Sequence, residues 1–99
     1  MSREKLKKRR ISDADVYETI LQMCAAAGLD STVRPEDIAA EIYPEDWQSI
    51  RKRVRLFAKQ LAQAGHLVML RKGKVVDPDG AKGIVRLQIS PAFLAGHDK

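Results

Sequence analysis

The chain has 99 residues, 44% of them hydrophobic and 31% charged, and a formal net charge of +5. A chain of this length builds one modest core, which leaves too few residues to enclose a deep active site as well. Its apolar runs are too short for a membrane span, and the basic N-terminus lacks the apolar stretch of a secretory signal. We therefore expect a cytoplasmic protein with no membrane partner. The single cysteine, Cys24, excludes an internal disulfide and a thiolate metal cluster.

The charges are segregated along the chain. Residues 1–10 carry six Lys or Arg against one Glu, and residues 11–46 carry one cation, Arg34, against nine carboxylates. Residues 47–76 carry eight cations and no acid. A fold built from these segments has a polarised electric field, and its basic side attracts a polyanion.

The first segments are predicted to be an arm and a helix. Residues 1–10 are expected to form a disordered basic arm, because they contain too few large apolar side chains to offset the entropy cost of ordering. A solubilising tail explains them equally well. The first helix is expected to begin at Ser12, with Ser12 and Asp15 in a capping box, and to end at Gly28. Its predicted buried stripe contains Ala14, Tyr17, Ile20, Leu21 and Cys24, widened by Val16, Met23 and Ala27.

Two further helices are predicted in the middle of the chain. Residues 31–33 are short and β-prone, and can form an isolated strand. Proline and two carboxylates at residues 35–37 are typical of a helix start, so a second helix is expected from Pro35 to about Ile42. Residues 43–46 break this helix at Pro44. The third helix is expected from residue 44 or 45 to Ala64, with Gly65 as its stop.

The remaining residues are predicted to form strands. Residues 66–76 indicate a β-hairpin with a cationic turn at 71–74, followed by a loop at 77–83 and a strand at 84–89. The predicted fold is mainly α with a small β-sheet, an α+β class with three helices and a C-terminal hairpin. One domain is expected at residues 11–90, with a C-terminal tail at 91–99.

The third helix has an apolar side and a basic side. Ile50, Val54, Phe57 and Leu61 fall on one side at helical spacing, and Trp47 and Phe57 are expected in the core. Arg53 lies nearer this buried side, where its stem can snorkel. The opposite side collects five polar residues, which are Gln48, Arg51, Lys52, Arg55 and Lys59.

A solvated helix face is the plain alternative to a binding surface, because long cations are good helix formers. Such a face usually mixes Glu with Lys, however, and like charges four residues apart, such as Arg51 and Arg55, destabilise a helix by roughly a few tenths of a kcal/mol. The missing acids favour a surface that binds a phosphate backbone, since neutralised phosphates release their condensed counterions.

The order of predicted elements is that of a winged helix-turn-helix. In that architecture the third helix enters the major groove of duplex DNA, and the hairpin, or wing, lies along the neighbouring backbone or minor groove. Gln48 and Arg51 are the candidates for base contacts. The expected phosphate contacts are Lys52, Arg55 and Lys59 on the helix and Arg71, Lys72 and Lys74 on the wing.

From about residue 31 to 89 the chain also resembles a family of small bacterial proteins known only as a domain of unknown function with a winged-helix fold. Two positions depart from the family pattern, because Arg34 stands where members often have cysteine, and Val85 follows Gly83 and Ile84 where members often have Gly-Pro-Ile. The resemblance implies a fold and no established activity. It is carried by residues 35–39 (Pro-Glu-Asp-Ile-Ala), Trp47, Val54, Arg55, Ala58, Leu61, Gly65, Gly73, residues 76–78 (Val-Asp-Pro), Gly83, Ile84 and Arg86.

Other motifs do not indicate an enzyme. Residues 77–80 resemble the start of a calcium loop but lack its remaining ligands, so they are interpreted as a turn in which Asp77 accepts backbone hydrogen bonds or pairs with Arg86. His66 and His97 lack the acidic neighbours of a metal site. The sequence contains no phosphate-binding glycine loop, no nucleophile motif and no plausible triad. We therefore expect no catalytic activity, no cofactor and no metal.

Two functions remain open from the sequence. The first is a winged-helix protein that binds duplex DNA, as a transcriptional regulator does. The second is a winged-helix adaptor whose basic side meets an acidic protein, with Leu56 as an apolar anchor on another face. A monomer and a homodimer are both compatible with the sequence, the latter through the first helix and the segment around Phe93.

Overall fold

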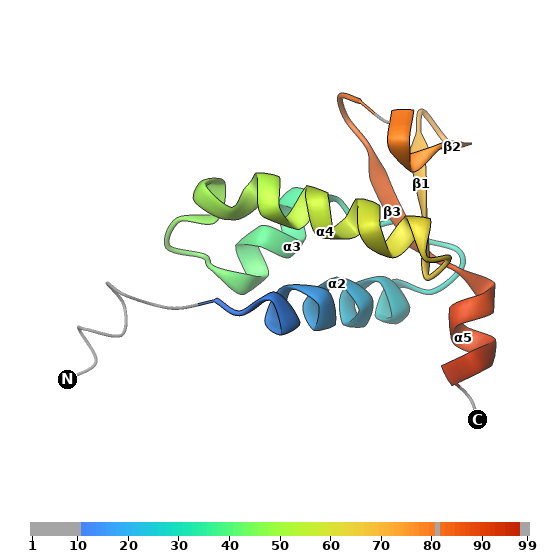
Figure 1. Cartoon of the computed structure of the whole chain (residues 1–99), viewed down its shortest axis with the longest axis horizontal. Coiled ribbons are helices and arrows are strands. Elements are labelled where there is room, and N and C mark those ends of the chain that lie inside the picture. Colours follow the sequence, from blue (N-terminus) through green and yellow to red (C-terminus); the bar gives the residue numbers. More distant parts are fainter. Residues whose placement is uncertain (1–10, 81, 98–99) are drawn as a thin grey trace.

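The computed structural model describes residues 11–80 and 82–97. The arm predicted for residues 1–10 lies outside these ranges. Helices dominate and a small antiparallel sheet follows, which confirms the predicted α+β class (Figure 1). The α-helices are α2 (Asp13–Ala27), α3 (Pro35–Ile42), α4 (Arg51–Gln63) and α5 (Pro91–His97), with short 3-10 helices η1 (Trp47–Ile50) and η2 (Pro78–Gly80). The strands are β1 (Leu67–Arg71), β2 (Lys74–Val76) and β3 (Arg86–Ile89).

Helix α2 begins with the predicted capping box. The Ser12 hydroxyl accepts a hydrogen bond from the Asp15 amide at 3.0 Å, and the Asp15 carboxylate accepts one from the Ser12 amide at 3.4 Å. Its buried residues are Val16, Ile20 and Cys24, so the side of α2 that faces the core contains every fourth residue. The predicted stripe was therefore partly wrong. Ala14 is exposed, whereas Tyr17 and Leu21 are half-buried at the edges of the core, and the Tyr17 ring stacks on that of Phe57 at 4.5 Å.

Helix α3 has the predicted bounds, whereas α4 begins later than predicted. The amide of Asp46 bonds to the Tyr43 carbonyl, and the amide of Ser49 bonds to the Asp46 carbonyl, each at 3.1 Å. These tight turns lead into η1 instead of continuing as an α-helix, so α4 starts at Arg51. Its end is as predicted: Gly65 has φ +90°, and the His66 amide bonds to the Leu61 carbonyl at 2.9 Å in a Schellman motif.

The strands form one antiparallel sheet in the order β2-β1-β3. A two-residue turn joins β1 to β2, with Lys72 at φ 55° and Gly73 at φ 81°, which suits the twist of a hairpin. The predicted isolated strand is a single bridge, in which Val33 and Leu87 exchange two hydrogen bonds of 2.8 Å. This bridge ties the segment before α3 to β3.

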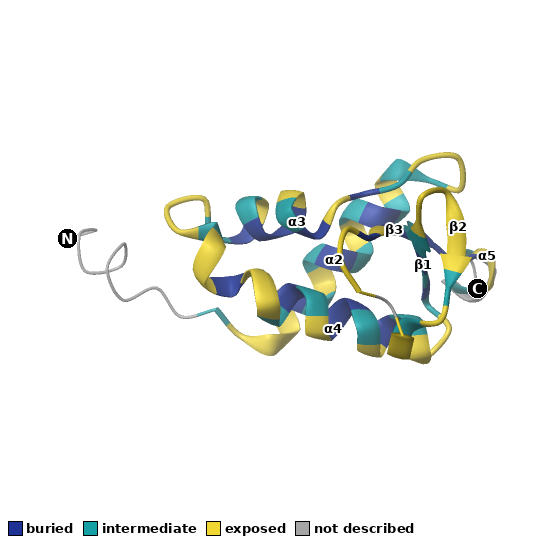
Figure 2. Ribbon diagram, turned by 90° about the horizontal axis from the view of Figure 1, so that it is seen from above, coloured by how far each residue is buried: buried dark blue, intermediate teal, exposed yellow. Residues whose placement is uncertain are grey.

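The core lies where α2, α3, α4 and β3 face one another (Figure 2). Phe57 is buried as predicted, while Trp47 is only half-buried and packs against the core. Residues 91–97 form α5, a helix that the sequence analysis did not predict. The buried Ser90 caps it by accepting a hydrogen bond from the Ala92 amide at 3.1 Å. No helix within the described ranges is long and apolar enough to span a bilayer.

Candidate nucleic-acid interface

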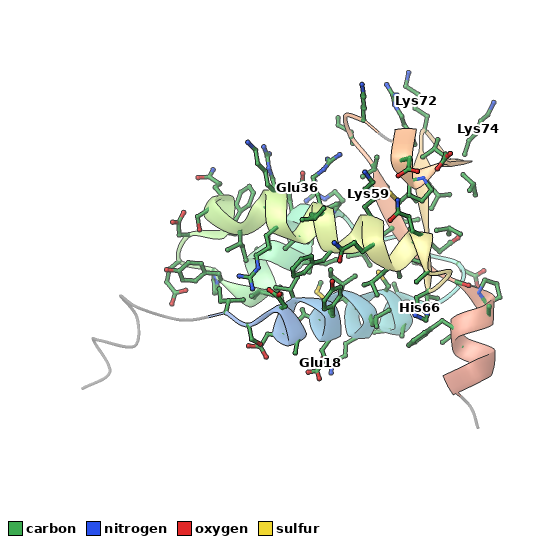
Figure 3. The ribbon with its side chains drawn as sticks, viewed as in Figure 1. Glu18, Glu36, Lys59, His66, Lys72 and Lys74 are labelled. Atoms are coloured by element: carbon green, nitrogen blue, oxygen red, sulfur yellow. The ribbon has the colours of Figure 1, made fainter. Side chains whose placement is uncertain are left out.

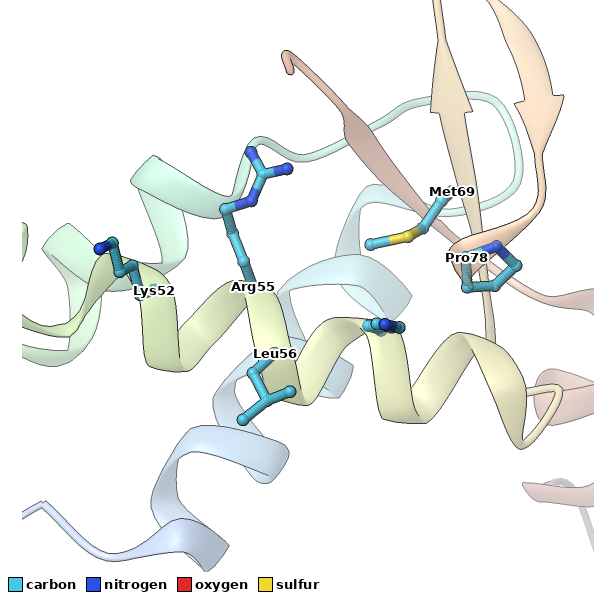
Figure 4. Close-up of a pocket in the computed structure, with 6 residues that line it drawn as sticks. Lys52, Arg55, Leu56, Met69 and Pro78 are labelled. Carbon is cyan, nitrogen blue, oxygen red and sulfur yellow. The ribbon is translucent and has the colours of Figure 1, made fainter. Parts of the chain in front are cut away.

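Helix α4 has one buried side and one charged side. Val54, Phe57, Ala58 and Leu61 are buried. Arg51 and Lys52 are exposed at the first turn, and Gln48 is exposed in η1 just before it. Figure 4 shows Lys52 and Arg55 leaving α4 on the side where the strands stand. The side chains predicted to share a surface on this helix therefore lie on its outside.

Arg53 is held on the other side of α4, against the start of α2. Its guanidinium donates hydrogen bonds to the Ile11 carbonyl at 2.7 Å and to the Asp13 carboxylate at 2.6 Å. It also lies over the Phe57 ring, 5.7 Å from the centroid. Its separation from the other cations, predicted from helical spacing, is confirmed, and its role in the structure is to join two helices.

Two of the predicted contact residues have partners within the protein. Arg55 donates a hydrogen bond to the Gly83 carbonyl at 2.9 Å. The Lys59 ammonium lies 3.6 Å from the Asp79 carboxylate, which also accepts a hydrogen bond from the Gln63 amide at 2.6 Å. The sequence analysis missed these contacts, because the loop that carries them follows the acid-free stretch and folds back onto α4. Asp77 and Asp79, the first acids after this stretch, were the sequence signal for such a pairing.

The hairpin between β1 and β2 supplies the remaining cations. Arg71 and Lys74 are Cα partners beside the turn, and Lys72 occupies the turn itself. All three are exposed. Lys72 and Lys74 extend to the same side of the molecule as Lys59 (Figure 3). We call the side chains of Gln48, Arg51, Lys52, Arg55, Lys59, Arg71, Lys72 and Lys74 the basic face.

Within the part of the chain that the structure describes, most cations of the basic face have no polar partner. In residues 11–80 and 82–97, no hydrogen bond or ion pair is found for the side chains of Arg51, Lys52, Arg71, Lys72 or Lys74. Glu18 of α2 points to the opposite side of the molecule (Figure 3).

A shallow groove lies on the basic face between α4 and the strands. Its volume is about 230 Å³. Met69, which is almost fully buried, forms an apolar part of its wall, and the other lining residues are Lys52, Arg55, Leu56, Lys59 and Pro78 (Figure 4). The groove combines cations with apolar atoms, so it can contact a ligand that is both anionic and partly apolar.

A cysteine thiol, or a cluster of His, Cys, Asp or Glu side chains, often marks a reactive or metal-binding site, so the surroundings of these residues indicate whether such a site is present. Burial raises the pKa of the Cys24 thiol from its ordinary value of 9.0 to about 12, so the reactive thiolate is disfavoured in the folded protein. Within the described ranges, no group of three or more His, Cys, Asp or Glu side chains is placed to hold a metal ion. The Asp77 carboxylate accepts a hydrogen bond from the Asp79 amide at 3.0 Å, which is the backbone role predicted for it.

The family described as "Protein of unknown function (DUF3253)" matches residues 13–90. The chain belongs to this family. The match extends from α2 to Ser90, just beyond β3, so it includes the whole basic face. No curated protein matches the chain. The resemblance to a domain of unknown function is therefore confirmed.

Proposed function

We propose that this cytoplasmic protein is a winged-helix protein that binds double-stranded DNA through its basic face and regulates transcription without catalysing a reaction. The order of elements supports the winged-helix assignment. It runs from α2 through the Val33 bridge, α3 and α4 to the β1–β2 hairpin and β3. In this assignment α4 is the recognition helix and the hairpin is the wing.

The observation that carries this proposal is a set of five cations at the two ends of the basic face that have no polar partner among the described residues. Arg51 and Lys52 lie at the start of α4, where the positive end of the helix dipole adds to their potential. Keeping cations together opposes folding through mutual repulsion. Phosphates relieve that repulsion, and the release of counterions from DNA provides the free energy of binding.

The residues of the basic face have different roles in this proposal. Gln48 and Arg51 lie nearest the start of α4 and contact base edges, because Gln reads adenine and Arg reads guanine with paired hydrogen bonds. Lys52 and the three wing cations contact phosphates and fix the register of the duplex. Arg55 contributes through the guanidinium N–H groups that the Gly83 carbonyl does not use, and Lys59 contributes after exchanging Asp79 for a phosphate oxygen.

The test is a salt titration of binding to random-sequence duplex DNA. The double variant Lys52→Gln/Lys74→Gln removes two proposed phosphate contacts that have no polar partner among the described residues, so we expect it to reduce the log–log salt slope by about 1.8, at roughly 0.9 per phosphate contact. The control is Gln22→Glu/Ala26→Glu, which makes the same change in net charge at exposed positions of α2. Absence of binding at low salt, or an equal slope for both double variants, would refute the proposal.

A second candidate is an adaptor that binds an acidic protein. It is favoured by the groove, because Leu56 is 51% exposed and lies beside Lys52 and Lys59. An acidic peptide with one apolar anchor fits such a surface. A complex that survives nuclease treatment and is lost on Leu56→Ser, while DNA binding is unchanged by that substitution, supports this function. Loss of the complex on nuclease treatment eliminates it.

A further inference from the structure

An exposed isoleucine lies within the cationic surroundings of the basic face. The large apolar residues that the structure exposes most are Ile84, at 81%, and Val75, at 67%. Single exposed apolar residues are common on protein surfaces, so exposure alone indicates nothing. Ile84 is distinguished by the cations near it. Lys82 precedes it by two residues and Arg86 follows it by two. A third cation, Arg55, donates a hydrogen bond to the carbonyl of the adjacent residue, Gly83.

The segment that carries Ile84 is fixed on both sides. Val85 and Leu87 directly after it are buried in the core, and Leu87 pairs with both Val33 and Met69. Before it, Arg55 reaches from the middle of α4 to the Gly83 carbonyl, and Gly83 adopts φ 77°, a value that favours glycine. The β-branched side chain of Ile84 has few rotamers of its own. Little conformational entropy is therefore lost when a ligand contacts it.

The segment leading into β3 stands beside the hairpin turn at the edge of the molecule (Figure 1). This is the edge toward which Lys59, Lys72 and Lys74 point (Figure 3). Because Arg55 of α4 holds the Gly83 carbonyl next to Ile84, a duplex that contacts both α4 and the hairpin can reach this exposed apolar side chain. Several DNA-binding proteins use an isoleucine, leucine or similar side chain in this setting to enter the minor groove and partly unstack a base step.

We propose that Ile84 is an apolar wedge that enters the minor groove of bound DNA and bends the duplex, with the cations on both sides holding the adjacent phosphates. This inference rests on the proposed function. Arg55 is a positioning residue for the wedge, since its bond to Gly83 sets the distance between the loop and α4. The wedge favours pyrimidine–purine steps such as TA, which unstack most readily.

The experiment compares the full chain with two variants on duplexes labelled at both ends for energy transfer. One duplex contains a central TA step and the other has none. Ile84→Ser removes the apolar side chain, and Val75→Ser is the matched control on β2, at another exposed β-branched position. Ile84→Leu restores an apolar side chain of the same size, which guards against a local effect of serine on the loop.

We expect the wild type and Val75→Ser to bend the TA duplex and to prefer it. Ile84→Ser should bind that duplex about tenfold more weakly, from the lost burial of one isoleucine, and should bend it less while keeping the same salt slope. Ile84→Leu should keep both bend and preference. Equal bending by wild type and Ile84→Ser, or equal losses in Ile84→Ser and Val75→Ser, would overturn the wedge alone. Failure of the wild type to bind DNA would overturn the proposed function together with it.

Discussion

In the proposed complex Asp79 competes with DNA for Lys59, so we expect that removing its charge strengthens DNA binding. The two side chains are 38% and 71% exposed, and a pair this exposed contributes about 0.2–1 kcal/mol. The carboxylate also repels a phosphate about 10 Å away by roughly 0.4 kcal/mol in water. Together these effects oppose DNA binding by about 0.6–1.4 kcal/mol. We therefore expect Asp79→Asn to lower the Kd about three- to tenfold.

The substitution is suited to this purpose because asparagine keeps the oxygen that accepts the hydrogen bond from Gln63. The assay is fluorescence anisotropy with a labelled random-sequence duplex, repeated over a range of salt concentrations. The gain should shrink as salt rises, because these charges are exposed and screened. Glu18→Gln is the control, since it removes the same charge on the opposite side of the molecule (Figure 3). An equal gain from Glu18→Gln, or none from Asp79→Asn, would refute the reasoning.

Two further predictions concern stability. Arg53→Gln removes the guanidinium that joins α4 to Ile11 and Asp13, so we expect the free energy of unfolding in denaturant to fall by about 2 kcal/mol; an unchanged value would show that this contact is not stabilising. The Cys24 thiol stays protonated in the folded protein up to a pKa of about 12, whereas in the unfolded chain it ionises near 9.0. Its contribution to stability is thus complete below about pH 9 and decreases as pH rises toward 12. Cys24→Ala should show a smaller decrease over this range, and equal pH dependence of the two proteins would contradict the prediction.

The parts of the fold that were predicted correctly depend on local signals. Ser12 and Asp15 form the capping box, and proline at position 35 begins α3 where it was expected. The hairpin was predicted from its apolar run and a short cationic turn at residues 71–74, and the structure narrows this turn to Lys72 and Gly73, both at positive φ. Each of these features is decided by residues within a few positions of one another.

The parts that were not predicted depend on competing or distant contacts. The acids at residues 45 and 46 suit a helix start. The carbonyls of Tyr43 and Asp46, however, accept hydrogen bonds from the amides three residues later, which form tight turns, so α4 begins at Arg51. For α5 a local signal existed, because Ser90 before Pro91 is typical of a capped helix start. The segment was interpreted as a tail because it is short. The contact between Lys59 and Asp79 joins residues on α4 and η2, which come together only when the chain folds. Local sequence patterns therefore do not predict it.

That contact changes the interpretation of the acid-free stretch. A window of residues 47–76 contains no carboxylate, yet the folded chain brings Asp79 to Lys59 and the Gly83 carbonyl to Arg55. The middle of the basic face is therefore less positive than its ends. Arg51 and Lys52 at one end and the hairpin cations at the other keep their charge available for phosphates. A straight DNA duplex would be held evenly along the basic face only if the cations were evenly distributed. In the proposed complex, we therefore expect the two separated cationic ends to hold the DNA backbone at two places, and the exposed Ile84 to contact a base step between these places.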